Sequence, residues 1–106
     1  MDIRELAAGL NKTDIQLIND PQPVGVLGNT LYIPLPGTGC RIRVTVTQFI
    51  DDEYWVQFAF INPASGVIDS VTRELGVIDN VTLLITRPKV SDIVADLLEY
   101  AAVWRI

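Results

Sequence analysis

Acidic side chains are the residues of this chain whose types and spacing best suit acid–base chemistry. Asp51, Asp52 and Glu53 form its densest group of carboxylates, and paired carboxylates can act as general acid and general base. The three residues lie between two apolar runs, in a turn where water keeps carboxylate pKa values ordinary. They also supply fewer oxygen ligands than the roughly six or more that a calcium ion takes. We therefore expect a solvated turn, with no catalytic residue, metal or cofactor.

Nucleophilic catalysis finds equally little support in the sequence. The chain has no histidine, which excludes Ser-His-Asp and Cys-His catalysis and all histidine metal ligands. Cys40 is the single cysteine and stands beside Arg41, a cation that can lower the pKa of a thiol. Neither a base nor a helix N-terminus accompanies it, so a buried strand cysteine is the simpler interpretation. The sequence favours a protein that is not an enzyme.

The net charge argues against a nucleic-acid partner. Thirteen acidic against eight basic residues give a formal net charge of −5, and such a field repels a phosphate backbone. Two small basic spots remain, one at Arg41 and Arg43 and one at Arg87 and Lys89. We interpret both as solvated strand ends rather than phosphate sites, because protein surfaces normally mix charges of both signs.

Composition and length predict one cytoplasmic domain over residues 1–106. Charged residues follow Met1 where a secretory leader would need apolar ones. The longest uncharged run, residues 21–40, contains four prolines and four glycines, which is typical of loops and edge strands rather than of a membrane span. A single cysteine also excludes an internal disulfide. We expect no membrane partner.

Hydrophobic periodicity predicts a helix near each end of the chain. A short helix is expected over residues 2–10, where apolar residues recur at helical spacing. A longer helix is expected over residues 92–104, with Ser91 as its N-cap. The apolar faces consist of Ile3, Leu6, Ala7 and Leu10 in the first helix and Ile93, Val94, Leu97, Leu98, Ala101 and Trp104 in the second.

Two alternating runs, residues 41–50 and 54–61, predict a β-hairpin. A two-residue loop would pair Ile50 with Glu53 and set apolar residues against polar ones. Opposing Ile50 to Tyr54 instead gathers the apolar residues on one face, which we predict to be the core face. Its members are Ile42, Val44, Val46, Ile50, Tyr54, Val56, Phe58 and Phe60.

The fold class is therefore predicted to be α+β. We expect a single domain with a mainly antiparallel sheet of about five or six strands and both helices packed on one face. A buried strand is expected from Val81 to the residue before Pro88.

A ten-residue echo precedes the last strand. Residues 66–72 and 76–82 agree at six of seven positions, a spacing that suits successive strands of a meander. Two copies are too few for a repeat architecture. We therefore expect the two copies to lie in different local structures. For residues 67–75 both helix and strand remain open, with strand slightly favoured.

The sequence supports two hypotheses of function. The first is a non-enzymatic interaction or adaptor module, a homodimer or a protein that binds a protein partner, because the outer sheet face and last helix carry surplus apolar residues. The interface would use Phe49, Trp55, Ile61 and Val103. The opposing interpretation is that the N-terminal helix or the Pro- and Gly-rich loop covers that face.

The second hypothesis is a small-molecule binding domain, with an apolar pocket between sheet and C-terminal helix. Its lining would be Tyr32, Phe58, Phe60, Tyr100 and Trp104, with Arg43 as an anion anchor. A small apolar ligand would suit this composition, and an enzyme would further need a carboxylate of raised pKa inside the pocket.

Overall fold

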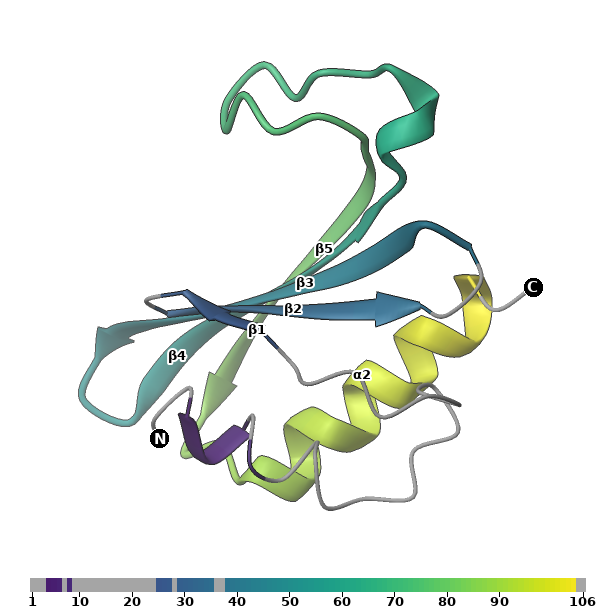
Figure 1. The fold of residues 1–106 in the computed structure, drawn as a ribbon. Coiled ribbons are helices and arrows are strands. Elements are labelled where there is room, and N and C mark those ends of the chain that lie inside the picture. The colour runs from purple at the N-terminus through teal and green to yellow at the C-terminus, as the bar shows by residue number, and fades with distance from the viewer. Residues whose placement is uncertain (1–3, 7, 9–24, 28, 36–37, 105–106) are drawn as a thin grey trace.

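The computed structural model describes residues 4–6, 8, 25–27, 29–35 and 38–104. One antiparallel sheet is covered on one face by a helix (Figure 1). The elements are β1 Gly25–Leu27, β2 Thr30–Leu35, β3 Cys40–Ile50, β4 Glu53–Ile61, the 3-10 turn η1 Pro63–Ser65, β5 Val77–Thr86 and α2 Val90–Trp104. The strand order is β1-β2-β3-β4-β5, so each strand pairs with its neighbour in the chain. The predicted α+β class is confirmed, as is the mainly antiparallel sheet, which was expected to have about five or six strands and has five among the described residues.

Both ends of the chain contribute helix to the same face of the sheet. Residues 4–6 and 8 are helical, and Leu6 is fully buried in one cluster with Ile93 and Leu97 of α2. This confirms the described part of the predicted N-terminal helix; Ile3, Ala7 and Leu10 lie outside the described residues. Helix α2 begins at Val90, so Ser91 lies in its first turn and is not the predicted cap. The carbonyl of Lys89 instead accepts the first helical hydrogen bonds.

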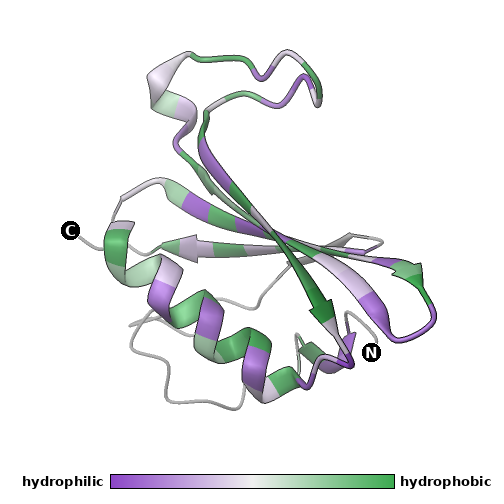
Figure 2. Ribbon diagram, turned by 180° about the vertical axis from the view of Figure 1, so that it is seen from behind, coloured by the Kyte–Doolittle hydropathy of each residue, from purple (hydrophilic) through white to green (hydrophobic). Residues whose placement is uncertain are grey.

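The core lies between the sheet and the helices. Val44 pairs with Phe58 and both are buried, and α2 packs its own apolar side chains against this row. Figure 2 shows hydrophobic and hydrophilic residues alternating along α2, as expected for a helix with one face in the core. The buried helix residues are Ile93, Val94, Leu97 and Ala101. Apolar residues spaced three and four apart thus hold α2 on the sheet.

The β3–β4 pairing corrects one part of the predicted register. Ile50 pairs with Glu53 across a two-residue turn. A β-bulge between Gln48 and Ile50 lies immediately next to this pair in β3. Asp52 adopts φ 64, which closes the tight turn. The predicted pairing of Ile50 with Tyr54 is therefore wrong, and Ile50 is 53% exposed rather than in the core. The bulge takes up the extra residue, so Ile42, Val44, Val46, Val56, Phe58 and Phe60 share the buried face as predicted.

Strand β5 is not the buried strand that the sequence predicts. It is the last strand in the order, and Val81 and Leu84 are 38% and 48% exposed. The apolar run suggested a buried strand, but among the strands that the structure describes β5 has β4 as its one neighbour. Its position at the edge therefore decides its exposure.

The two copies of the echo have different structures, as predicted. Residues 66–76, which we call the arm, rise from the face of the sheet opposite α2 (Figure 1). Within the arm, Ile68 forms an isolated antiparallel bridge with Leu75, and residues 67–75 contain no helix. The second copy continues from Gly76 into β5.

Gly76 at the base of the arm should tolerate no side chain. Its φ is +90, and a Cβ there would lie 2.4 Å from the carbonyl oxygen of Asn62. Gly66 has a similar φ of +73 but no atom within 4 Å of its Cβ position. We expect Gly66→Ala to cost about 1–2 kcal/mol, the cost of left-handed backbone, and Gly76→Ala to cost about 1–3 kcal/mol more because of the clash. Urea unfolding of both variants measures the difference, and equal losses would contradict the packing described.

Candidate functional site

The four predicted interface residues do not form one surface. Phe49 and Trp55 are 56% and 39% exposed, and their rings meet edge to face at 5.8 Å on the face opposite α2. Ile61 is fully buried beside the base of the arm. Val103 is 75% exposed but lies on α2, across the sheet from Trp55. A single contact surface cannot include all four.

The predicted pocket residues also divide between the two faces of the sheet. Phe60 stacks on Trp104 with ring centroids 4.4 Å apart, and Phe58 lies 5.6 Å from Tyr100. These pairs fill the space between β4 and α2. Tyr32 and Arg43 pair with each other across β2 and β3, on the other face, because Arg43 alternates with the buried Ile42 and Val44. The six residues therefore do not line one pocket.

A shallow groove of about 280 Å³ lies beside the filled region, between β5 and α2. Its lining consists of Phe58, Val81, Leu83, Asp96, Glu99, Tyr100 and Val103. We call this the β5–α2 groove. Phe58 and Tyr100 were predicted as pocket residues and Val103 as an interface residue, and the other four were not predicted as site residues. The spacing of Asp96, Glu99 and Val103 places them on one side of α2, a helical signal that could have identified that wall.

A partly buried hydrogen bond connects Tyr100 of the groove lining to β5. The hydroxyl of Tyr100 donates to Oδ2 of Asp79 at 2.9 Å, which connects α2 to β5. Burial, together with the bond to Asp79, raises the pKa of Tyr100 well above its ordinary value. The phenol therefore stays protonated over the physiological range and keeps its role as a donor.

The free edge of β5 borders the groove. Among the residues that the structure describes, no strand pairs with β5 on the side away from β4. Strand β5 is ten residues long, and Asp79 is its one charged residue. Proline, lysine and inward-pointing charge usually protect such an edge from pairing. From Asn80 to Thr86, strand β5 has no proline, lysine or charged side chain.

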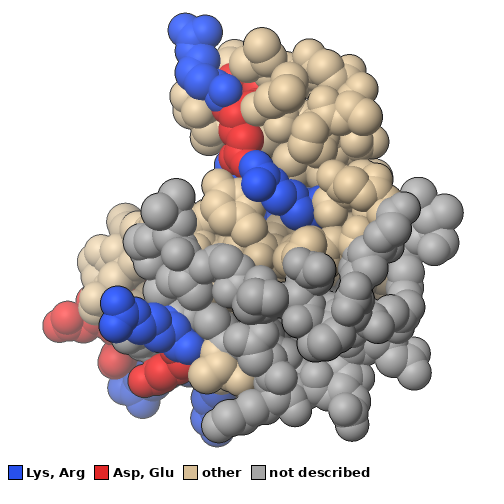
Figure 3. All heavy atoms as spheres, viewed as in Figure 1, with Lys and Arg blue, Asp and Glu red and all other residues tan. Residues whose placement is uncertain are grey.

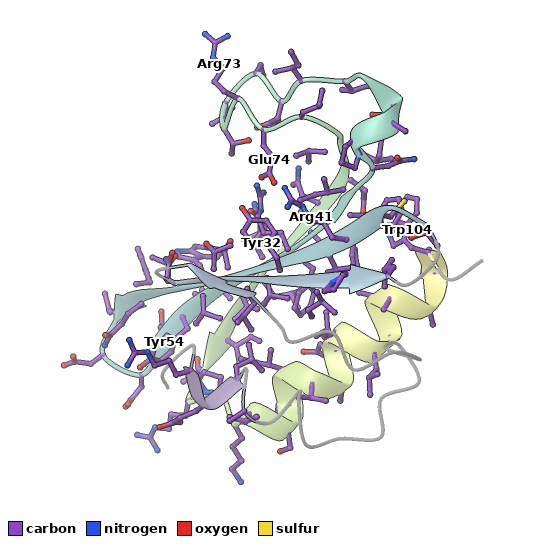
Figure 4. All side chains as sticks on the ribbon, in the orientation of Figure 1. Tyr32, Arg41, Tyr54, Arg73, Glu74 and Trp104 are labelled. Carbon is purple, nitrogen blue, oxygen red and sulfur yellow. The ribbon has the colours of Figure 1, made fainter. Side chains whose placement is uncertain are left out.

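A polar cluster lies on the opposite face, between the sheet and the arm. Glu74 of the arm accepts through Oε1 from Nη2 of Arg41 at 3.1 Å and through Oε2 from Nη1 of Arg43. The guanidinium of Arg41 lies 4.4 Å above the ring of Tyr32, a cation–π contact. Figure 4 shows Glu74 extending from the arm toward Arg41 and Tyr32. We call Arg41, Arg43 and Glu74 the arginine–glutamate cluster.

Neutral side chains continue the cluster toward β5. Nη2 of Arg43 donates to Oε1 of Gln57 at 3.2 Å, and Nε2 of Gln57 donates to Oγ1 of Thr82 at 3.4 Å. The side chain of Arg43 is 8% exposed and that of Glu74 is 16% exposed. The interpretation of Arg43 as a solvated strand end is therefore wrong, because the arm removes it from water. Figure 3 shows a small acidic area of the arm directly above basic side chains of the sheet.

The chemical groups singled out in the sequence do not assemble into a catalytic centre in the described part of the chain. Asp51 and Asp52 form the β3–β4 turn and Glu53 begins β4. Asp52 forms an exposed ion pair with Arg87 at 3.2 Å. Cys40 is buried, and its Sγ lies 3.6 Å from the carbonyl of Thr38. Within the described ranges, no three His, Cys, Asp or Glu side chains are placed to hold a metal ion.

Comparison with known proteins identifies no relative of this chain. No family model matches the chain, and neither the curated proteins nor the solved structures contain a significant match. Across the residues that the structure describes, no helix has the length and apolar character needed to cross a membrane.

The turn at the tip of the arm should depend on Thr72. Oδ2 of Asp69 accepts from the hydroxyl of Thr72 at 2.6 Å and from its backbone N–H at 2.7 Å. The side-chain bond and then the backbone bond lower the pKa of Asp69 below its ordinary 3.8. Since the folded-state pKa is the lower one, the turn gains stability above the unfolded value and loses it as the pH falls below that value.

Thr72→Val keeps the backbone donor and removes the hydroxyl, so the pKa of Asp69 should rise toward 3.8. An NMR titration of side-chain carboxyl carbons measures this directly. Thr86→Val at the far end of β5 is the matched control and should leave the pKa of Asp69 unchanged. An unchanged pKa in Thr72→Val would show that the hydroxyl bond does not form in solution.

Proposed function

We propose that this protein is a non-enzymatic interaction module that binds an extended segment of a partner protein along the edge of β5. The observation that supports the proposal is a ten-residue strand whose outer edge pairs with no other strand in the described part of the chain. A strand added to such an edge gains main-chain hydrogen bonds, and pockets beside the edge select its alternate side chains. The β5–α2 groove is such a pocket.

Apolar residues flank β5 on both faces of the sheet. On the α2 side, Val81 and Val103 line the groove. On the other side, Leu84 is 48% exposed and pairs with Trp55. The side chains of an added strand alternate between faces, so one set would enter the groove and the other would meet Leu84 and Trp55. Both sets would then be partly removed from water, which favours binding.

The charge beside the groove determines the chemistry of the partner. Asp96 and Glu99 line it on the α2 side, and the whole chain carries a net charge of −5. Opposite charge across an interface speeds association and rejects partners of the wrong sign. The favoured segment therefore alternates apolar and basic side chains.

A second copy of the chain is the competing occupant. Antiparallel pairing of two β5 edges requires a two-fold axis perpendicular to the sheet, which keeps both α2 helices on the same side. The Asp96 and Glu99 side chains of both copies would then flank one seam. Because like charges across an interface oppose association, we favour a basic partner over the homodimer expected from the sequence.

A synthetic peptide of the length of β5, with valine alternating with lysine, tests the proposal. We expect the valine–lysine peptide to bind the protein and to slow hydrogen exchange of the β5 amides. A peptide of the same length in which valine alternates with glutamate should do neither. Val81→Lys places like charge against the peptide and should weaken binding by about tenfold, or about 1.4 kcal/mol. Val71→Lys makes the same change on the arm, where Val71 is 86% exposed, and should leave binding unchanged.

Light scattering over a dilution series separates the two occupants. A monomer that binds the lysine peptide supports the proposal. A dimer that Val81→Lys dissociates and Val71→Lys does not would replace the partner segment with a second copy. Equal binding of the valine–lysine and valine–glutamate peptides would refute the proposal that Asp96 and Glu99 select a basic partner.

A further inference from the structure

The arginine–glutamate cluster has more hydrogen-bond donors than acceptors. Each guanidinium carries five N–H groups, and Glu74 and Gln57 accept from three of the guanidinium nitrogens, Nη2 of Arg41 and both Nη atoms of Arg43. Nε of Arg41 and Nε of Arg43 are buried and have no partner among the described residues. Buried polar groups are nearly always paired in folded proteins. The unpaired donors indicate that this site can accept a further oxygen-rich group.

The charges of the cluster point to the same kind of group. Two guanidinium cations form ion pairs with one carboxylate, that of Glu74, in a chain that is acidic overall. Asp69 of the arm also interacts with Arg43, but only through the weakest of the effects that lower its pKa, so the ion pairs leave one arginine charge unmatched at hydrogen-bonding distance. Arg43 contributes this charge from a nearly buried position, where electrostatic interactions are stronger than in water. Because a guanidinium fork matches the oxygens of phosphate, a dianion with several oxygens would neutralise both arginines.

Glu74 can leave the cluster without disturbing the core. It lies on the arm, and the large apolar residues of the arm are all at the surface: Val67, Ile68, Val71 and Leu75 are 45–86% exposed. Among the described residues, the side-chain hydrogen bonds between the arm and the sheet are those of Glu74. Gly76 and Asn62 hold the base of the arm through a backbone bond of 2.7 Å. The arm can therefore release Glu74 and remain attached at its base.

We propose that Arg41 and Arg43 form a binding site for a phosphate group, and that Glu74 is an internal competitor for this site. The phosphate oxygens replace the carboxylate of Glu74 and also accept from the unpaired Nε groups. Tyr32 holds the plane of Arg41 in place through the cation–π contact. Phosphate binding then frees the arm and exposes Glu74. This site lies on the opposite face of the sheet from the β5–α2 groove and does not depend on the function proposed for the groove.

Inorganic phosphate at constant ionic strength is the probe, and the arginine Nε–H signals in NMR spectra report its binding. Glu74→Gln removes the competing charge and preserves the size of the side chain. A tethered competitor acts at an effective concentration in the millimolar range, so its removal should raise phosphate affinity by at least about tenfold. Glu5→Gln makes the same change in net charge at an exposed position of the N-terminal helix and should leave phosphate affinity unchanged. Adding Arg43→Gln to the Glu74→Gln variant should abolish binding.

A purely structural role of Glu74 predicts the opposite result. In that case Glu74→Gln would destabilise the protein and gain no affinity for phosphate, which would overturn the proposal. If Glu74→Gln is unstable alone, phosphate should raise its Tm more than it raises that of Glu5→Gln; equal shifts would also overturn the proposal. Glu74→Asp keeps the charge on a shorter side chain, and a gain in affinity smaller than that of Glu74→Gln is expected.

Discussion

The pairing of β3 with β4 is the constraint on which the rest of the structure depends. Side chains alternate along a strand, so a slip of one residue would move Arg43 into the core and Val44 out of it. The observed register avoids this, with Val44 opposite Phe58 and Arg43 opposite Ala59. The bulge before Ile50 lets a tight two-residue turn coexist with that register. Both candidate surfaces follow from this pairing.

Because of the β3–β4 register, the two faces of the sheet carry different kinds of side chain. The apolar face is covered by α2, where aromatic pairs fill the space against β4 and a groove remains between β5 and α2. The other face carries Arg41 and Arg43 and is covered in part by the arm. An apolar edge with an acidic wall and a shielded cationic site therefore lie on opposite sides of one thin layer. A partner strand and a phosphate group could occupy them independently.

Much of the local structure was predictable, because it depends on neighbours in the chain. Alternation identified the β3–β4 hairpin and six of its buried residues, and helical spacing identified the stripe of α2. The predicted pocket combined Tyr32 and Arg43 with residues of the other face. This happened because the type of an aromatic or cationic residue does not indicate the face of the sheet on which it lies. Strand β5 was expected to be buried, since an apolar run has the same pattern at an edge as in the centre of a sheet.

The sequence by itself determined which side chains share a strand face or a helix stripe, because the periods of 2.0 and about 3.6 residues are properties of the local backbone. Only the tertiary structure decided which strand lies at the edge and what covers the outer face. Arg43 and Glu74 are 31 residues apart in the chain, and their contact forms because the β4–β5 connection folds back over the sheet. Such a contact depends on long-range packing, which no local pattern of residues encodes.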